Sequence, residues 1–402
     1  MNSILDRVAS LVVSGMSNID IATEIGVTTR TVSNYRKRIR ESDDYPTVAA
    51  YEQKSRDVSN KRRKTIREDA RVYNVQTSIA DELKSLLSNH SFHPIKHKAA
   101  KPDLDRAVGV IQVSDVHFNE LIDDVDGNKF DFDVASRRLH KLADQATKQF
   151  KAHGITNVAV FFTGDLLNSD RRLDEITSAA TNRSNAIFLA VDILQQMIND
   201  LLCNFDTVTI ASVTGNESRV GADNHWSDFL AGDSYDIVIH NMLSLLFANE
   251  PRVKVVPISD PMECVVKVLN THFLLVHGHG HRGLANTSNI ENEVLKIKAG
   301  YAARGVLVDY VICGHIHSAY VSDLFSRSSG LPGTNSYARK ALNLHGKSSQ
   351  NIYVVHADGS IDSTKVCLQQ YKDFSPYEYD RSIESYNQRS AVKTITIQSV
   401  LI

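Results

Sequence analysis

The stretch VGVIQVSDVH, residues 108–117, is the most informative segment of this chain. Its first part, Val108 to Val113, is mostly apolar and β-branched, and short runs of this kind are typical of buried strands. Asp115 and His117 follow directly. A carboxylate and an imidazole are therefore expected just beyond the carboxyl end of a strand, which is where open α/β sheets carry their sites.

The same arrangement recurs four more times. The further apolar runs predict strands at Val158–Phe162, Val208–Val213, Phe273–Val276 and Val308–Cys313. The polar clusters that follow them are Gly164-Asp165-Leu166-Leu167-Asn168, Gly215-Asn216-Glu217, His277-Gly278-His279 and Gly314-His315-Ile316-His317. Asp, Asn and His supply oxygen and nitrogen ligands, which suit borderline divalent metals such as Mn²⁺, Fe²⁺ or Zn²⁺. Five such clusters in one chain predict a dinuclear metal centre.

Size and composition are those of an enzyme with one large and one smaller domain. The 402 residues carry a net charge of −2, so any affinity for nucleic acid must come from local patches. The four cysteines have no CxxC spacing, which argues against a disulfide framework or a zinc ribbon. The N-terminus soon turns polar, and no long apolar run indicates a membrane span or a signal peptide. We expect a cytoplasmic protein without membrane contact.

Residues 1–40 predict a small all-α helix-turn-helix domain. Ala22, Gly26 and Val32 have the spacing of a helix crossing, a left-handed turn and an apolar anchor. Thr28 or Thr29 can cap the third helix. That helix carries outward residues suited to base edges and phosphates, namely Arg30, Thr31, Asn34, Arg36 and Lys37. The alternative is a helical module used for dimerisation or packing.

The rest of the chain divides into a helical, basic connector at 41–105, a catalytic domain at 106–375 and a C-terminal tail at 376–402. Within the catalytic domain, predicted helices alternate with the strands, which indicates a layered α/β core. These helices are Phe132–Phe150, Ile176–Leu202, Tyr235–Phe247 and Ile290–Lys298. Runs at Ile352–Val355 and Thr364–Leu368 flank Asp358-Gly359 and predict a β-hairpin. Ser328–Tyr337, rich in Gly and Ser, is expected to be a mobile loop near the site.

The ordered set DxH, GDxxN, GN, H and GHxH resembles the calcineurin-like metallophosphoesterase superfamily, whose members include a recombination-repair nuclease branch. The resemblance covers residues 108–370. It implies a two-sheet sandwich flanked by helices and a dinuclear metal-dependent hydrolase. It assigns Asp115, His117 and His317 to one metal, Asn216, His277 and His315 to the other, and Asp165 to both. Mn²⁺ is the expected metal, with Fe, Zn, Mg or Ni as alternatives.

One position departs from this resemblance. The family usually has a His after Gly-Asn that helps protonate the leaving oxygen, whereas Glu217 stands there in this chain. The proton donor is then Glu217 itself, His225, His279 or His281, unless the leaving group needs little protonation or catalysis is weakened. Arg219 is expected either to clamp a phosphate or to form a structural ion pair. The candidate catalytic residues are Asp165, Asn216, Glu217, Arg219 and His279.

Three functions remain open from the sequence. The first, which we favour, is a metal-dependent DNA nuclease that cleaves phosphodiester bonds. The second is a phosphomonoesterase acting on phosphoproteins or nucleotides, and the third is a non-catalytic DNA-binding scaffold. DNA is the expected partner, with a homo-oligomer or a partner ATPase subunit as further candidates, and the combination of modules suggests a bacterial or bacteriophage origin. Asn168 is expected to orient a ligand, and the charged residues 170–175 are expected to be solvated.

Overall fold

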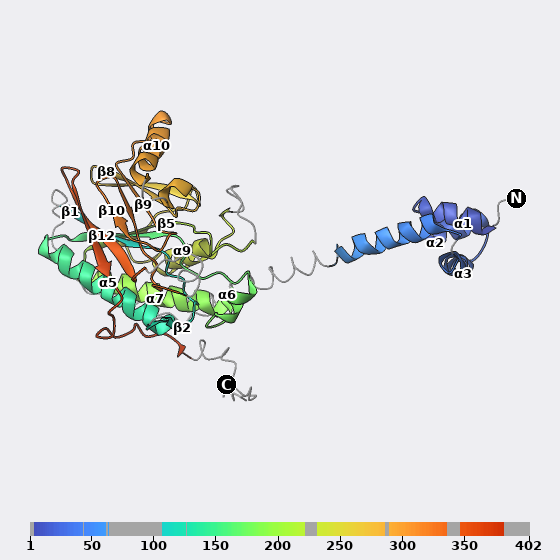
Figure 1. Ribbon diagram of the computed structural model, residues 1–402, viewed down its shortest axis with the longest axis horizontal. Coiled ribbons are helices and arrows are strands. Elements are labelled where there is room, and N and C mark those ends of the chain that lie inside the picture. Colours follow the sequence, from blue (N-terminus) through green and yellow to red (C-terminus); the bar gives the residue numbers. More distant parts are fainter. Residues whose placement is uncertain are drawn as a thin grey trace. The chain divides into compact units, whose positions relative to one another are not determined.

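The computed structural model describes residues 4–42, 44–61, 63, 107–125, 127–221, 231–285, 289–335 and 346–381 (Figure 1). The chain forms two compact units, Met1–His90 and Ser91–Ile402. Most of the predicted connector, together with His225 and the end of the predicted C-terminal tail, lies outside the described residues. The four-part division expected from the sequence stays a prediction.

The N-terminal unit contains the predicted helix-turn-helix. Its helices are α1 (Ile4–Val13), α2 (Asn18–Ile25) and α3 (Thr29–Arg40), and residues 46–61 are also helical. Thr28 caps α3 by accepting a hydrogen bond from the amide of Thr31. Gly26 ends α2 at a φ of 75°, a conformation that glycine adopts without a steric cost. Val8, Val12, Ile21, Val32 and Ile39 form the buried core of the three helices.

The C-terminal unit is built on two sheets. The six-stranded sheet has the order β13-β12-β1-β4-β5-β6. Its members are β1 (Ala107–Val113), β4 (Asn157–Thr163), β5 (Thr207–Val213), β6 (Val253–Val255), β12 (Ser349–His356) and β13 (Ile361–Cys367). Strands β1, β4, β5 and β6 run parallel. Strands β12 and β13 form the predicted hairpin, and β12 joins it to the sheet by pairing antiparallel to β1.

The five-stranded sheet has the order β10-β11-β9-β8-β7. Its members are β7 (Glu263–Val268), β8 (Thr271–Val276), β9 (Tyr310–Cys313), β10 (Tyr320–Val321) and β11 (Phe325–Arg327). Strands β8, β9 and β11 are parallel, and the outer two pair antiparallel. A separate two-stranded ribbon joins β2 (Ile122–Val125) to β3 (Asn128–Phe130).

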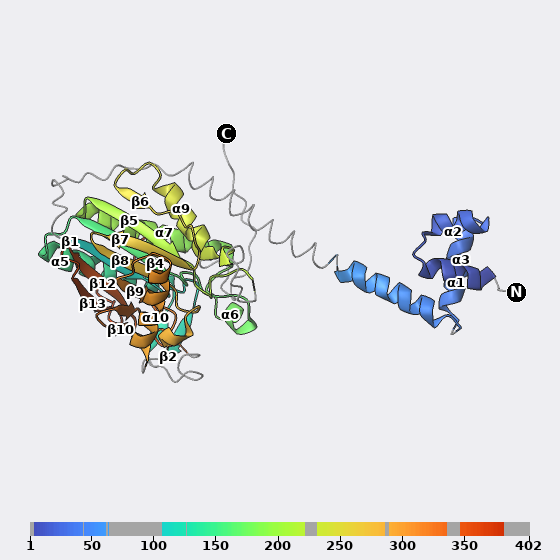
Figure 2. The same cartoon turned by 90° about the horizontal axis from the view of Figure 1, so that it is seen from above.

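The two sheets pack face to face. Alternate residues of both meet in one buried cluster, in which Val110, Phe161 and Val213 from the first sheet join Phe273 and Ile312 from the second. The outer face of the six-stranded sheet is covered by α5 (Phe132–Ala152), α7 (Arg183–Asn204) and α9 (Tyr235–Leu246) (Figure 2). The outer face of the other carries α10 (Ile290–Ala303) and the short 3₁₀ helix η1 (Arg282–Ala285). The predicted two-sheet sandwich flanked by helices is confirmed.

One predicted helix is wrong. The segment expected as a single helix at Ile176–Leu202 is broken into α6 (Leu173–Thr177) and α7. Between them the backbone bonds to a neighbouring loop instead of to itself: Ser178 accepts from the amide of Leu121, and Ala180 donates to the carbonyl of Asn119. Asn182 then starts α7 as its N-cap.

Helix α7 is long and apolar enough to cross a membrane by length and composition alone. Of its most apolar window, 67% is buried inside the C-terminal unit, where Ile187, Leu194 and Leu201 are fully covered. The helix is apolar because it packs between α5, α9 and the sheet, as a core helix of a layered α/β protein does.

Candidate metal centre

The five predicted motifs lie together at one edge of the sandwich. They follow β1, β4, β5, β8 and β9, whose carboxyl ends meet there because β1, β4 and β5 are parallel neighbours, as are β8 and β9. Backbone hydrogen bonds join the loops: Asp115 donates to the carbonyl of Gly164, His117 to that of Asp165, and Gly314 to that of His277. The structure thus brings the side chains of the five motifs together at this edge.

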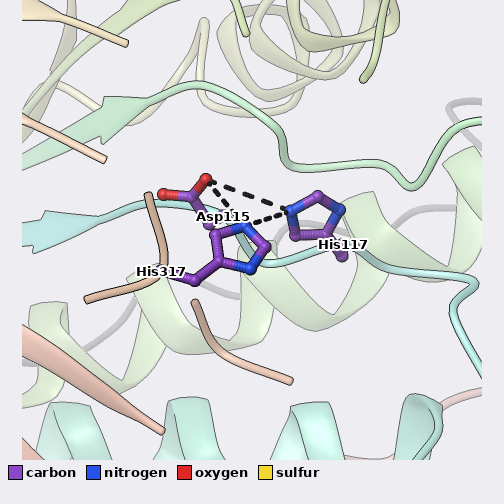
Figure 3. Close-up of side chains that lie close together, drawn as sticks. All are labelled: Asp115, His117 and His317. Carbon is purple, nitrogen blue, oxygen red and sulfur yellow. Dashed lines mark hydrogen bonds and ion pairs between the residues drawn. The ribbon is translucent and has the colours of Figure 1, made fainter. Parts of the chain in front are cut away.

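Asp115, His117 and His317 form the first ligand cluster (Figure 3). Their ligand atoms all lie within 4.8 Å of one another. The Nε2 atoms of the two imidazoles are 3.0 Å apart, and the carboxylate Oδ1 of Asp115 lies 3.3 Å from Nε2 of His317 and 4.0 Å from that of His117. Three donor atoms from two different sheets therefore point at one position.

Asp165, His277 and His315 form the second cluster within the same limit. Nε2 of His277 lies 2.9 Å from Oδ2 of Asp165 and 3.1 Å from Oδ1 of Asn216. The amide oxygen of Asn216 thus joins the carboxylate and the imidazoles at a second convergent position. All seven predicted metal ligands lie in one of these two clusters or in contact with it.

The backbone at the ligands is held in a strained conformation. Asp115, His117, Asp165, His315 and His317 all have φ between 47° and 71°, in the left-handed region that non-glycine residues rarely adopt. Such conformations cost of order 1–3 kcal/mol each and persist only where the surroundings impose them; they cluster at functional sites. Loops that turn this sharply bring successive side chains to one point.

Two glycines permit the loops to approach. A Cβ built on Gly164 would lie 2.5 Å from the backbone nitrogen of Gly215 and 2.8 Å from Nδ1 of His277, and one on Gly314 would collide with the side chains of Ser114 and Asp115. Any larger residue at these positions would separate the strand ends. The glycines of the motifs are therefore needed for close packing around the ligands.

Hydrogen bonds fix the orientation of the ligands from behind. Nδ1 of His277 is 2.8 Å from the carbonyl of Thr163, and Nδ1 of His117 is 3.1 Å from Oδ1 of Asn168. An imidazole whose Nδ1–H is bound to an oxygen presents the lone pair of Nε2 to the cluster, which is the usual arrangement around a metal-binding His. The carboxylate, imidazole and amide donors of the two clusters fit divalent cations. Asn168, which the sequence predicts to orient a ligand, lies against the ring of His117.

The carboxylates are buried and ionised. Burial alone raises the pKa of Asp115, but the hydrogen bond from His317 and the charges of His277 and His317 outweigh it and hold that pKa at about 2. Burial also raises the pKa of Asp165. The charge and hydrogen bond of His277, and then the charge of His117, outweigh burial and hold that pKa far below its usual range. Burial followed by the charge of His277 lowers the pKa of His315 to about 4, which keeps its ring neutral. Burial lowers the pKa of His277 and His317, but Asp165 raises that of His277 to about 10 and Asp115 raises that of His317. Metal binding requires ionised carboxylates and neutral imidazole, so a cation must displace the protons of these two rings.

Asp236, at the start of α9, is a buried residue that the sequence analysis missed. Its Oδ1 accepts from the amide of Leu166 at 2.9 Å, and its Oδ2 accepts from Asp165 at 3.1 Å and Gly215 at 2.8 Å. Burial, and then Asp165, raises its pKa to about 6 against the opposing effect of these amides. One carboxylate thereby ties the loop after β4 to the loop after β5. In the sequence, Asp236 resembles an ordinary first-turn acid of a helix.

The segment beginning at Ser328 also differs from the expectation of a mobile loop. Residues 328–333 are buried, and Ser329 donates to the carbonyl of His317. Gly330 packs against the His317 ring, where a Cβ would lie 3.0 Å away. Gln350 joins this loop to the first motif by donating to the carbonyls of Ser114 and Ser329. The segment therefore lies near the site, as predicted. Its buried polar contacts explain why residues 328–333 are packed rather than mobile. Residues 336–337 lie outside the described part of the chain.

The other predicted catalytic residues surround the second cluster. The ring of His279 lies 5.5 Å from that of His277 and 6.2 Å from that of His315. Burial, and then His277, lowers its pKa to about 3. Arg219 donates to the carbonyl of Asn216. Both carboxylate oxygens of Glu217 accept hydrogen bonds, from Arg171 and Asn216, so the charged run at 170–175 is not simply solvated.

In the N-terminal unit, Arg30, Asn34 and Lys37 differ from Arg36 in their surroundings. Thr31 lies on α3 together with these residues. The side chains of Arg30, Asn34 and Lys37 are exposed to solvent. Arg36 is engaged within the module: its Nε donates to Glu52 at 3.2 Å and its Nη1 to Asn18 at 2.6 Å.

The fold and site define a two-sheet α/β protein with paired carboxylate–imidazole clusters, joined to a helix-turn-helix module. Residues 6–41 match the model of the luxR family of bacterial regulatory proteins (GerE). No curated protein gives a significant match to the chain.

Several solved structures resemble the chain. Wild-type Vps29 of Entamoeba histolytica, complexed with Zn²⁺, is 13% identical with a TM-score of 0.30, covering 65% of this chain and 99% of that one. Vacuolar Protein Sorting 29 of Cryptosporidium parvum is 12% identical with a TM-score of 0.30, covering 65% and 100%. A conserved uncharacterised protein of Streptococcus pneumoniae, a predicted phosphoesterase, is 12% identical with a TM-score of 0.24, covering 64% and 97%. These values are too low to transfer a function to this chain.

Proposed function

We propose that this protein is a dinuclear metal-dependent phosphoesterase that hydrolyses phosphodiester bonds in DNA. The observation that carries the proposal is the pair of buried ligand clusters, each converging within 4.8 Å at the carboxyl ends of the strands. Their carboxylate, imidazole and amide donors suit Mn²⁺, with Fe, Zn, Mg or Ni as alternatives. Two such cations, when bound, supply Lewis-acid polarisation of phosphoryl oxygen and an activated water.

Each side chain has a distinct part in this proposal. Asp115, His117 and His317 hold one cation, and Asn216, His277 and His315 hold the other. Asp165 serves both, because its carboxylate faces His277 while its charge also acts on His117. Arg219, beside Asn216, offers its guanidinium to a phosphate oxygen. His279 lies next to the second cluster and supplies a further imidazole near a leaving oxygen.

The helix-turn-helix module favours DNA over other phosphate esters as the substrate. Arg30, Asn34 and Lys37 lie along α3, the helix that in such modules enters the major groove. Thr31, near the start of the same helix, completes the proposed contact surface. Arg36, held by Asn18 and Glu52, is assigned to holding the module together rather than to base contact. A cytoplasmic location fits a DNA substrate.

The first test is hydrolysis by the full chain loaded with Mn²⁺. We expect cleavage of bis-p-nitrophenyl phosphate to exceed that of p-nitrophenyl phosphate, and both to stop when a chelator is added, because the chemistry depends on the bound cations. Cleavage of defined single- and double-stranded DNA then identifies the substrate form. A preference for the monoester would support the phosphomonoesterase alternative, and no hydrolysis of either ester by a protein that binds two equivalents of Mn²⁺ would support a scaffold.

The second test separates DNA affinity from chemistry. Replacing Arg30, Asn34 and Lys37 together by Ala should weaken DNA binding by at least about tenfold and lower the salt slope by roughly one for each lost phosphate contact. Hydrolysis of the nitrophenyl diester should not change, because all proposed metal ligands lie in the other unit. Arg7→Ala is the control, since Arg7 is an exposed basic residue on α1 paired with Glu24. Equal DNA affinity in the triple variant and the control would contradict the role of α3.

A further inference from the structure

Glu217 lies at the junction of two motif loops, and its contacts assign it a function different from proton donation. Its Oε1 accepts a hydrogen bond from Nδ2 of Asn216 at 2.5 Å. Its Oε2 accepts from Nη2 of Arg171 at 3.0 Å. Its backbone amide donates to Oδ1 of Asp165 at 2.6 Å. In this arrangement both carboxylate oxygens are acceptors, and the residue touches two of the proposed metal ligands.

The contact with Asn216 fixes which end of the amide faces the cluster. A side-chain amide has one oxygen that can bind a cation and one NH₂ group that cannot. Because the NH₂ group of Asn216 donates to Glu217, Oδ1 is left facing Nε2 of His277 at 3.1 Å. Without an acceptor at this place, rotation of the amide by half a turn would present N–H groups to the cation. The carboxylate of Glu217 therefore selects the orientation that can bind.

Arg171 anchors Glu217 from the neighbouring loop. Its side chain is only 13% exposed. Its Nη1 donates to the carbonyl of Asn216 at 2.9 Å, while its Nη2 holds Glu217. Glu175 supports it in turn, because Oε2 of that buried carboxylate accepts from the amides of Arg171 and Arg172, each at 3.0 Å, and from the hydroxyl of Ser169 at 2.6 Å. The turn after β4 is thus built to hold a guanidinium against the turn after β5.

We propose that Glu217 and Arg171 act as a pair of positioning residues that orient Asn216 as a ligand of the second cation. The inference rests on the proposed dinuclear metal centre and adds to it the residues that determine how one ligand is presented. It also accounts for a glutamate directly after Asn216, since a carboxylate can accept from an amide and a guanidinium at once.

The test uses the full chain with Mn²⁺ as the probe, and compares Glu217→Gln, Arg171→Gln and the double variant with the wild type. Gln keeps the shape of Glu217 but has a single acceptor oxygen, so it cannot hold both Asn216 and Arg171. We expect Glu217→Gln to weaken Mn²⁺ at one of the two sites by about 10–100-fold, as loss of a hydrogen bond to a metal ligand does, and to leave the other site unchanged. Titration calorimetry and electron paramagnetic resonance of Mn²⁺ measure the affinities of the two sites separately.

Two further readouts separate positioning from other roles. The double variant should bind Mn²⁺ no more weakly than the poorer single variant, because both changes break the same contact network. The dependence of kcat on the leaving-group pKa across aryl phosphodiesters should stay as in the wild type. Asp144→Asn is the matched control: Asp144 is 29% exposed, as Glu217 is, and is paired with Lys148 at 2.6 Å on α5. It should change neither affinity.

The outcomes are distinct. Unchanged Mn²⁺ affinities together with a steeper dependence on leaving-group pKa would show that Glu217 is a proton donor, and equal weakening of both sites with a lower Tm would show that it is a structural support. Either result overturns the positioning role while leaving the metal centre intact. A wild-type protein that binds no Mn²⁺ would overturn the proposed function and the positioning role together.

Discussion

Replacing Asp165 by Ala is expected to remove the hydrolytic activity and to reduce the bound Mn²⁺ from two equivalents to one or fewer. Asp165 is 1% exposed, its Oδ2 lies 2.9 Å from His277 of the second cluster, and its charge interacts with that of His117 in the first. Metal ions contribute several kcal/mol to transition-state stabilisation, and each ~1.4 kcal/mol is tenfold in rate, so kcat should fall by at least about a thousandfold. Metal analysis and diester hydrolysis on the same preparation measure both effects.

Asp309→Ala is the control for this experiment. Asp309 pairs with His272 at 2.9 Å, the same distance as in the Asp165–His277 pair, but His272 lies near the start of β8 whereas His277 follows its end. The control should retain both equivalents of Mn²⁺ and the wild-type rate. Two equivalents bound to a folded Asp165→Ala variant would show that this carboxylate is not shared by the two cations.

Replacing Asp236 by Asn is expected to cause the largest loss of stability among the single changes considered. Each carboxylate oxygen accepts backbone amides, three in total, from Asp165, Leu166 and Gly215. An Asn side chain must turn its NH₂ group toward at least one of these buried donors. A buried donor left unsatisfied costs about 1–3 kcal/mol, more when the lost partner is charged, so the free energy of unfolding should fall by about 2–4 kcal/mol. Denaturant unfolding of the full chain, monitored with a probe in the C-terminal unit, measures this free energy of unfolding.

The matched control is Asp133→Asn. Asp133 is the second residue of α5 as Asp236 is of α9, so any interaction with the helix dipole is the same in both. Its carboxylate is 24% exposed and is held by Arg137 and Arg381 rather than by loop amides. Exposed ion pairs contribute about 0–1 kcal/mol, so this variant should lose far less stability. Equal losses in the two variants would show that Asp236 acts only as a helix-start acid.

The Asp236 variant also tests how the site depends on its loops. Asp236 joins the turns that carry Asp165 and Asn216, so Mn²⁺ affinity should fall even under conditions where the variant remains fully folded. Supporting groups of this kind typically change metal affinity or activity by about 10–100-fold. Unchanged Mn²⁺ affinity in the folded variant would mean that the strained backbone and the glycines hold the ligands without this carboxylate.

The sequence by itself determined the chemistry of the site and the local structure that carries it. Each ligand follows an apolar run, and strand formation and the placement of a residue at a strand end depend on the nearest neighbours in the chain. The caps of the N-terminal helices, such as Thr28, and the left-handed turn at Gly26 are local in the same sense. These features could be predicted because a short apolar run, or a capping residue, is visible within a few positions.

Only the tertiary structure decided which side chains support those ligands. Arg171 stood in a charged run that looked solvated, and Asp236 looked like a helix-start acid. Both hold loops that are 45 to 71 residues away in the chain, through Asn216 and Asp165. The break between α6 and α7 was missed for the same reason, because the loop at 119–121 takes over the backbone hydrogen bonds of residues 178–181. Hydrogen bonds across such separations depend on how the strands are ordered in the sheets, and a single sequence contains no local signal for that order.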